Sequence, residues 1–210
     1  MIIAIDGPAG SGKGTLARKL AKALGYAHLD TGKLYRAVGM SVVEAGENPA
    51  NEEAALRAAR SLEPQMVVNK DLLGDIAAAS ASKVAAIRSV RAILLAFQRE
   101  FANAPPNRAK GAVLDGRDIG TVVCPDADIK LFVTASAEVR AKRRHKELLD
   151  RGEPSIYSRV LQDMKVRDKR DEGRAVAPLK PAHDALVIDT SELDADAVFE
   201  TAMSIVSEDT

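Results

Sequence analysis

The chain has 210 residues, of which 46% are hydrophobic and only 3% aromatic, and its 30 Lys and Arg side chains balance 30 Asp and Glu side chains. A chain of this size buries enough surface to fold without disulfides or a structural metal, and its single cysteine, Cys124, excludes an intramolecular disulfide, so we expect a reducing compartment, the cytoplasm. The balanced charge and the scarcity of aromatic rings argue against a protein that coats nucleic acid or an anionic membrane.

The N-terminal segment does not have the pattern of a signal peptide. It reaches Asp6 after one short apolar run and has no basic flank. No stretch of the chain approaches the roughly 20 apolar residues that a membrane-spanning helix needs. We therefore expect a cytoplasmic protein that has no membrane partner.

Short apolar runs alternate with longer helical patterns along the chain. The runs at 2–5, 27–29, 111–114, 129–133 and 185–188 predict five strands. Strands that alternate with helices favour an α/β fold, in which a parallel sheet carries helices on both faces.

Three helices are predicted from apolar residues at helical spacing. The first covers 15–24 and ends at Gly25. The second covers 90–101 with Ser89 as its N-cap, and the third follows Asp194. Nine apolar residues of the second and third helices are expected to face the core: Val90, Ile93, Leu94, Phe97, Phe101, Val198, Ala202, Ile205 and Val206.

Two stretches interrupt the alternation. Residues 63–86 contain a strand-like segment at 66–68, a turn at 69–71 and an alanine-rich run, which together predict a small insertion. Residues 138–174 carry twelve Lys and Arg against eight Asp and Glu, and Gly152 and Pro154 divide them into two helices. This composition fits a cationic flap with hinge points, although a solvated pair of charged helices has the same composition.

The strongest motif lies at 7–15, between the first strand and the first helix. Its sequence, Gly-Pro-Ala-Gly-Ser-Gly-Lys-Gly-Thr, matches a Walker A loop. Glycines let backbone N–H groups converge on phosphate oxygens, and Lys13 adds a full positive charge. Gly14 follows Lys13 and delays the hydroxyl to Thr15, a form typical of nucleoside monophosphate kinases. The G-x-G-x-G spacing excludes a dinucleotide fingerprint.

A second cluster follows the predicted strand at 111–114. Asp115, Arg117 and Asp118 come at the carboxyl end of that strand, where parallel sheets bind ligands, so they should face the same crevice as Lys13. Asp115 is placed like a Walker B acid that holds the water shell of magnesium. An ordinary Asp-Gly turn is the alternative.

Two further clusters contain arginines. Arg36 lies shortly after the second strand, where its planar side chain could clamp a phosphate. Arg167, Arg170, Asp171 and Arg174 recur at steps of three and four residues, so one helical face would present three guanidiniums and a carboxylate. Such a face is unfavourable unless anions neutralise it, and phosphoryl transfer needs positioned cations of this kind.

Together the four clusters closely resemble the bacterial cytidylate kinase family. The matching stretches are 5–15, 29–36, 115–123 and 174–179, in the order of the family. The resemblance implies a P-loop NTPase-type α/β fold with a parallel five-stranded sheet, helices on both faces, a small NMP-binding insertion and a helical lid. It implies one domain over 1–210, with the core at 1–60, 87–135 and 176–210, the insertion at about 61–86 and the lid at about 136–175.

The resemblance also implies roles for individual residues. The ATP phosphates would be bound by Gly7, Pro8, Ala9, Gly10, Ser11, Gly12, Lys13, Gly14 and Thr15. The acceptor phosphate would be held by Arg36, Arg117 and Arg174, cytosine by Ser82, Arg91 and Asp118, and the ribose by Arg167 and Asp171, and Thr31 would also contact the acceptor. The catalytic set would be Lys13, Arg117, Arg167, Arg170 and Arg174.

The implied reaction is in-line transfer of the γ-phosphoryl group of ATP to CMP or dCMP, with Mg²⁺ and without a covalent intermediate. We expect no direct metal ligand from the protein, with Asp115 acting through water. His28, His145 and His183 lack metal-ligand spacing, and Cys124 is expected to be a buried apolar side chain. We expect a monomer. The alternatives are a P-loop kinase that acts on UMP, AMP or shikimate, and a nucleotide-dependent regulatory switch.

Overall fold

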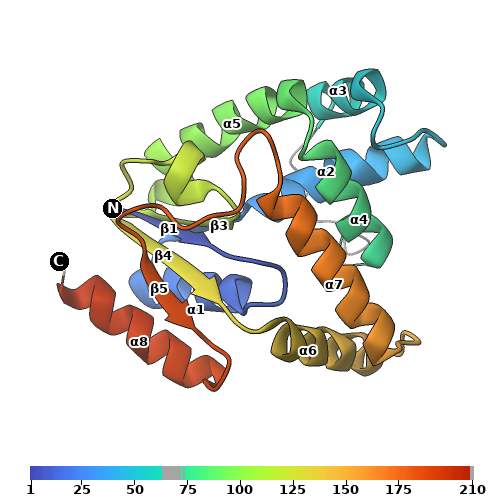
Figure 1. Ribbon diagram of the computed structural model, residues 1–210. Helices are drawn as coiled ribbons and strands as arrows, with labels where there is room; N and C mark the ends of the chain where they lie inside the picture. The colour runs from blue at the N-terminus through green and yellow to red at the C-terminus, as the bar shows by residue number, and fades with distance from the viewer. Residues whose placement is uncertain (63–71, 73, 209–210) are drawn as a thin grey trace.

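A computed structural model describes residues 1–62, 72 and 74–208 of the chain (Figure 1). The strand predicted at 66–68 and the turn predicted at 69–71 lie outside the described residues. The alanine-rich run that follows them forms a helix, α4 (Asp75–Val84).

All five predicted strands form one sheet, within two residues of the predicted bounds. They are β1 (Ile2–Asp6), β2 (Ala27–Asp30), β3 (Ala112–Gly116), β4 (Ile129–Thr134) and β5 (Leu186–Asp189). The order is β2-β3-β1-β4-β5, and every pairing is parallel. The predicted parallel α/β sheet is therefore confirmed.

Helices cover both faces of the sheet (Figure 1). Besides α4 they are α1 (Lys13–Leu24), α2 (Thr31–Glu44), α3 (Glu52–Arg60), α5 (Arg88–Asn103), α6 (Ala137–Asp150), α7 (Tyr157–Glu172) and α8 (Ala195–Glu208). Within the part of the chain that the structure describes, no helix is both long and apolar enough to cross a membrane.

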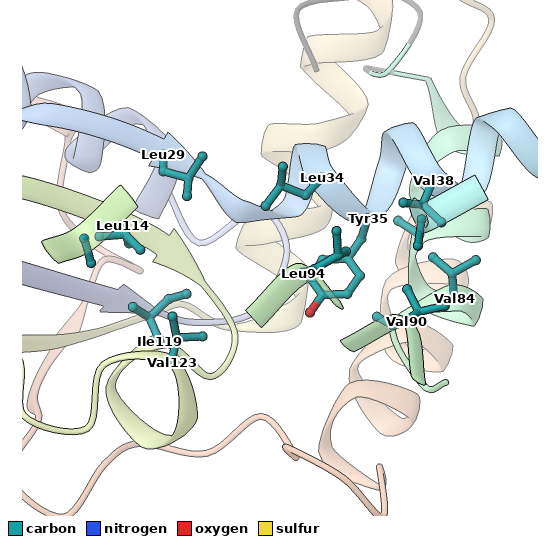
Figure 2. Packing of buried hydrophobic residues seen from close by; sticks show 14 of the residues in the cluster. Leu29, Leu34, Tyr35, Val38, Val84, Val90, Leu94, Leu114, Ile119 and Val123 are labelled. Carbon is teal, nitrogen blue, oxygen red and sulfur yellow. The ribbon is translucent and has the colours of Figure 1, made fainter. Parts of the chain in front are cut away.

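Successive side chains of the central strands point to opposite faces of the sheet, and this divides the core into two layers. Ala4 and Leu114 face a cluster that α2, α3, α4 and α5 cover. Figure 2 shows Leu29 and Leu114 toward one end of this cluster and Val38, Val84 and Val90 toward the other. Ile3 and its neighbours at every second position face the other cluster, which α1 and α8 cover. Successive side chains of a strand point to opposite faces, so a short apolar run buried throughout supplies both layers.

The prediction for the helix at 90–101 is wrong in two details. Helix α5 begins at Arg88 and has no side-chain N-cap, and the Ser89 hydroxyl donates to Glu52 Oε1 at 2.8 Å instead. Phe97 is 43% exposed. The buried face of α5 includes Arg91 and Gln98, because Arg91 forms a buried ion pair with Asp118. Apolar spacing alone cannot identify such a polar member of a buried face.

The charged stretch at 138–174 forms two helices, as predicted, and we call α6 and α7 together the flap. They share a small apolar cluster of their own, which includes Ala141, Leu148, Val160 and Met164. Gly152 lies in the connection between them with a φ of 74°, a left-handed conformation that glycine adopts without strain. Helix α8 follows Asp194, whose carboxylate accepts the N–H of Ala197 at 2.8 Å, and its inward residues agree with the prediction.

Candidate active site

Four predicted motifs meet at the carboxyl edge of the sheet. Strand β1 leads into the glycine-rich loop at 7–12, β2 into α2, and β3 into the segment at 116–118. The flap packs over the same edge. Because all strands are parallel, their carboxyl ends share one edge, which is where ligands bind in this architecture.

The glycine-rich loop has the tight geometry that its sequence predicts. A Cβ at Gly7 would lie 2.0 Å from the carbonyl oxygen of Val133, so no larger residue fits there. Gly12 has a φ of 93° and precedes the first residue of α1, which has no side-chain cap. The uncapped N–H groups of α1 therefore face the loop, as an anion site requires.

Lys13 opens α1, and its ammonium group donates to Pro8 O at 3.4 Å. Burial, and then the nearby Arg117, lower the pKa of Lys13 to about 7. An anionic ligand beside Lys13 would favour the charged form and raise this pKa again.

One cavity lies against the sheet edge, and we call it the sheet-side cavity. Its charged lining consists of six cations, Lys13, Arg36, Arg91, Arg117, Arg167 and Arg174, and four carboxylates, Asp30, Asp115, Asp118 and Asp171. Thr31 and Ser82 also line it. The excess of two positive charges suits a ligand that carries a single phosphate group.

Asp171 lies at the centre of a cluster of three arginines, Arg117, Arg167 and Arg174, in the lining of this cavity. Its carboxylate accepts from Arg117 Nε at 3.1 Å, from Arg174 Nη2 at 2.5 Å and from Ser82 Oγ at 3.2 Å, and Arg167 Nε lies 3.9 Å away. Burial raises the pKa of Asp171, but the three guanidiniums together outweigh it and lower that pKa. The cluster still has more cations than anions.

Two arginine nitrogens in this cluster have no hydrogen-bond partner among the described residues. The Nε atoms of Arg167 and Arg174 are buried and make no hydrogen bond to the described part of the chain. Burial and then Arg117 lower the pKa of Arg167 to about 9, so it stays charged at neutral pH. Buried cationic donors without a partner are unfavourable, and a phosphate oxygen would satisfy them.

A second buried ion pair, between Arg91 and Asp118, lies near the N-terminal end of α5. Arg91 Nη2 donates to Asp118 Oδ2, and Arg91 Nη1 donates to Ala85 O at 3.3 Å. The guanidinium also lies 5.6 Å from the centre of the Tyr35 ring. Burial raises the pKa of Asp118, against the lowering effect of Arg91 and Arg174. The three residues predicted to contact one base, Ser82, Arg91 and Asp118, therefore line one cavity.

Asp115 is the next-to-last residue of β3 and lies next to the glycine-rich loop. Its Oδ2 lies 2.8 Å from His28 Nε2, and its Oδ1 faces Gly14. Thr31 donates its hydroxyl to Asp115 O at 2.9 Å, so that hydroxyl already has a partner. Sequence reasoning missed the contact with His28, because only the pairing of β2 with β3 places His28 beside that strand.

The carboxylate of Asp115 fits a magnesium ion held through water. Among the described residues no group of three or more His, Cys, Asp and Glu side chains could hold a metal directly. Mg²⁺ keeps several waters and is commonly bound by one or two carboxylates together with phosphate oxygens. Asp115, buried next to the glycine-rich loop, would supply one such carboxylate.

A second cavity lies between the glycine-rich loop and the flap, and we call it the flap-side cavity. Its charged lining consists of Lys13, Arg18, Arg36, Arg143, Arg144, Arg167 and Arg170, with Asp75, Glu147 and Asp163. The excess of four positive charges suits a polyphosphate. Arg18, Arg143 and Arg144 were not predicted as individuals, although the basic excess of the stretch at 138–174 pointed to the flap.

The face predicted for Arg167, Arg170, Asp171 and Arg174 is formed only in part. Arg167 and Arg174 both pair with Asp171 and line the sheet-side cavity with it, whereas Arg170 does not. Helix α7 ends at Glu172, so Arg174 lies beyond it and reaches back to Asp171. Arg170 lines the flap-side cavity, whereas Arg174 lines the sheet-side cavity. The physical reason is that the chain leaves the helix at Gly173, so the three-and-four spacing does not continue to residue 174.

The two cavities share part of their walls. Ala9, Gly10, Lys13, Gly14, Arg36, Ser82 and Arg167 line both. Of the loop residues predicted to bind phosphate, Gly12 and Thr15 also line the flap-side cavity, whereas Gly7, Pro8 and Ser11 line neither. Lys13 and Arg167 thus lie at the junction, from where they can reach anions in either cavity.

Sequence reasoning also missed Asp6, which ends β1. It accepts the N–H groups of Ile119 and Gly120, both at 2.8 Å. Burial raises the pKa of Asp6 to about 7, although both N–H donors lower it. Its carboxylate holds the turn after β3, and a carboxylate that closes an apolar strand is the only sign of this in the sequence.

The amino-acid sequence matches a protein-family model described as cytidylate kinase over residues 3–208. A protein named cytidylate kinase from Paramagnetospirillum magneticum is 62% identical over 205 residues, which cover 98% of this chain and 97% of the relative. One of the same name from Rhodospirillum rubrum is 58% identical over 207 residues, with coverage of 99% and 97%.

Solved structures show a similar fold. A gluconokinase from Sinorhizobium meliloti has a TM-score of 0.51 and 16% identity, covering 99% of this chain and 91% of that one. An uncharacterized protein from Eubacterium ventriosum has a TM-score of 0.55 and 18% identity, with coverage of 99% and 98%. At these identities the likeness concerns the fold alone.

Proposed function

The chain belongs to the cytidylate kinase family, and from this premise we propose how its two cavities transfer the γ-phosphoryl group of ATP to CMP or dCMP. An oxygen of the acceptor phosphate attacks the γ-phosphorus in line, the bond to the β,γ-bridging oxygen breaks, and ADP leaves with that oxygen. The products are ADP and CDP or dCDP. The observation that carries the proposal is the junction of two cationic cavities at Lys13 and Arg167.

ATP is assigned to the flap-side cavity. The glycine-rich loop and the uncapped N-terminus of α1 offer backbone N–H groups to the phosphates, and Lys13 neutralises charge at the end that reacts. Arg170, together with Arg143 and Arg144, adds positive charge from the flap. Four cations line this cavity and not the sheet-side one, which agrees with the larger charge of ATP: Arg18, Arg143, Arg144 and Arg170.

CMP is assigned to the sheet-side cavity. Its phosphate would bind to Arg36, Arg117 and Arg174, where a buried Nε of Arg174 lacks a partner among the described residues. Arg167 and Asp171 would contact the ribose. The acceptor phosphate is already an anionic nucleophile, so the protein supplies position, charge neutralisation and exclusion of water.

The base would be recognised by Ser82, Arg91 and Asp118. The exocyclic amine of cytosine donates to a carboxylate, whereas its carbonyl and ring nitrogen accept from donors such as Arg91 and Ser82. Uracil reverses part of this pattern. A base that leaves these buried groups unpaired loses about 1–3 kcal/mol for each group.

We also propose Mg²⁺ as the metal, held by ATP phosphate oxygens and, through water, by Asp115. The ion would neutralise charge on the phosphates of ATP during transfer. His28 holds one oxygen of Asp115, which leaves the other facing the glycine-rich loop.

The flap is proposed to act as the lid of a single kinase domain, closing over ATP so that water does not accept the phosphoryl group. From the insertion at about 61–86, helix α4 would contact the acceptor through Ser82. We also propose that the protein is a monomer. A cytoplasmic location is supported by the single cysteine, which is buried.

The proposal is tested by a coupled assay with CMP, dCMP, UMP, AMP and shikimate as acceptors. We expect the highest kcat/KM with CMP or dCMP, and equal or better turnover of another acceptor would refute it. A regulatory switch would hydrolyse ATP slowly with no response to any acceptor.

Two variants separate the roles of the cavities. Asp118→Ala should raise the KM for CMP about tenfold or more, since it leaves a buried donor unpaired, while the KM for ATP stays within about threefold. Lys13→Ala should instead lower kcat, because it removes charge at the reacting phosphate. An unchanged KM for CMP in Asp118→Ala would contradict the role in base recognition.

A further inference from the structure

Arg140 of α6 is a buried arginine outside both cavity linings. Its Nε donates to Ala135 O at 2.9 Å, and its Nη1 donates to Ala9 O of the glycine-rich loop at 3.1 Å. Its Nη1 and Nη2 also donate to the two oxygens of Asp168, at 3.1 and 2.7 Å. The fixed shape of a guanidinium lets one side chain join three separate segments in this way.

The glycine-rich loop also packs directly on the flap at this point. A Cβ at Gly10 would lie 2.9 Å from Met164 Cε and 3.2 Å from Arg140 Cβ. The peptide at Ala9 and Gly10 therefore lies against both α6 and α7, and Arg140 donates to its carbonyl oxygen. Ala9 and Gly10 themselves line both cavities.

Asp168, the carboxylate that pairs with Arg140, directly follows Arg167 in the sequence. Arg167 lies at the junction of the two cavities, since it lines both, and its Nε lies 3.9 Å from Asp171 Oδ2. A movement of α7 relative to the loop would change the distance between Arg167 and Lys13. The contact between Arg140 and Asp168 resists such a movement, and the bond to Ala9 O anchors it to the loop.

From these contacts we propose that Arg140 is a positioning residue. It couples the glycine-rich loop to α7 and so holds Lys13 and Arg167 at the distance from each other that phosphoryl transfer requires. The proposal rests on the proposed function for its kinetic consequence. It differs from simple stabilisation, because replacing a buried ion pair by apolar residues of similar volume is often neutral for stability, whereas a displacement of about 1 Å in a reacting site can lower the rate about 100-fold.

The test is the double variant Arg140→Met/Asp168→Leu, which removes the buried pair and the bond to Ala9 O without leaving an unpaired charge. Arg140→Lys is the second variant, since it keeps the charge beside Asp168 but lacks the fork that also reaches Ala9 O. The matched control is Glu138→Gln, which removes an exposed ion pair between the same two helices, Lys165 Nζ to Glu138 Oε1 at 3.3 Å.

For the double variant we expect a kcat about 10- to 100-fold lower, with KM values for ATP and CMP within about threefold of the parent. The kcat of Arg140→Lys should lie between the values of the parent and of the double variant, and the kcat of Glu138→Gln should match that of the parent. Thermal unfolding shows whether each variant is folded. If the double variant does not fold, Arg140→Lys decides the question, and a kcat within about twofold of the parent overturns the proposal.

Amide hydrogen exchange of residues 9–12 provides a measurement that needs no substrate. The loop amides should exchange about tenfold faster or more in the double variant, because the loop loses its anchor, and at the parent rate in Glu138→Gln. Unchanged exchange, or a folded double variant with kcat within about threefold of the parent, overturns the proposal. If the parent protein does not phosphorylate CMP, only the proposed function fails, and the exchange rates still decide the role of Arg140.

Discussion

The Asp171 cluster allows a quantitative prediction about stability. Replacing Asp171 by Asn keeps the size of the side chain but removes the charge that three guanidiniums surround. The Asp171 side chain is only 2% exposed, and its arginine partners lie at 2.5, 3.1 and 3.9 Å. The variant therefore leaves buried positive charges facing one another.

The expected loss follows from this burial. Each pair of unit charges at about 4 Å interacts by on the order of 4 kcal/mol at an effective dielectric constant near 20, before desolvation is subtracted. Measured losses from removing one partner of a buried pair are about 3–5 kcal/mol. Asn retains a hydrogen-bond acceptor, so we expect about 3 kcal/mol, the lower end of this range. For a chain of this length that corresponds to a Tm lower by roughly 6–12 °C.

The assay is thermal unfolding at pH 7, with and without inorganic phosphate at constant ionic strength. The pKa of Asp171 is lowered in the folded protein, so its contribution is complete above the unfolded pKa and is lost only as the pH falls through the folded pKa. Phosphate should raise the Tm of Asp171→Asn more than that of the parent, because an anion replaces the missing charge.

The control is Glu172→Gln, which removes an exposed charge from the adjacent position of the same helix. Its Tm should stay within about 2 °C of the parent, as surface substitutions usually change stability by less than about 0.5 kcal/mol. An Asp171→Asn variant with an unchanged Tm, or with the same response to phosphate as the parent, would refute the view that Asp171 balances a cationic cluster.

Two further predictions concern the fold around the site. The pKa of Asp6 is raised from 3.8 to about 7, so the folded state holds a proton that the unfolded state has released. Asp6 therefore lowers the free energy of unfolding as the pH rises from about 4 to about 7. Denaturant titrations at several pH values should show a weaker fall of this free energy with pH in Asp6→Asn. The same fall in both proteins would contradict a raised pKa of Asp6. A Cβ at Gly39 of α2 would lie 2.8 Å from the backbone carbon of Ser80 in α4, so Gly39→Ala should lower the free energy of unfolding by about 1–3 kcal/mol. Gly74→Ala, at the N-cap of α4 where an added Cβ meets nothing within 4 Å, should cost less, since it loses only the preference of glycine for that position. Equal losses in urea unfolding would argue against close packing of α2 and α4.

Local sequence predicted most of the framework. The five strands and the helices at α1, α5 and α8 follow from runs of apolar residues, since hydrophobic period and length distinguish a buried strand from an amphipathic helix. The error at Phe97 concerns which face of α5 is buried. Arg91 occupies the buried face of α5 because Asp118 lies across from it, and no property of the helix sequence shows where Asp118 will be.

The candidate site was predictable where a motif carries its own geometry. The glycines at 7–14 and Lys13 specify a phosphate loop through backbone conformation, and that information is local in the chain. The resemblance to the cytidylate kinase family extended the prediction to arginines and carboxylates far apart in sequence.

What the sequence by itself determined is therefore the sheet, the phosphate loop and the family, because these depend on local periodicity, local backbone geometry and the order of motifs. Only the tertiary structure decided how the charges are shared: that Arg170 and Arg174 belong to different cavities, that Asp171 joins three arginines, and that Arg140 bonds to the phosphate loop. The physical reason is that a hydrogen bond or ion pair between distant residues depends on distances of a few ångströms, which are set by how helices end and pack.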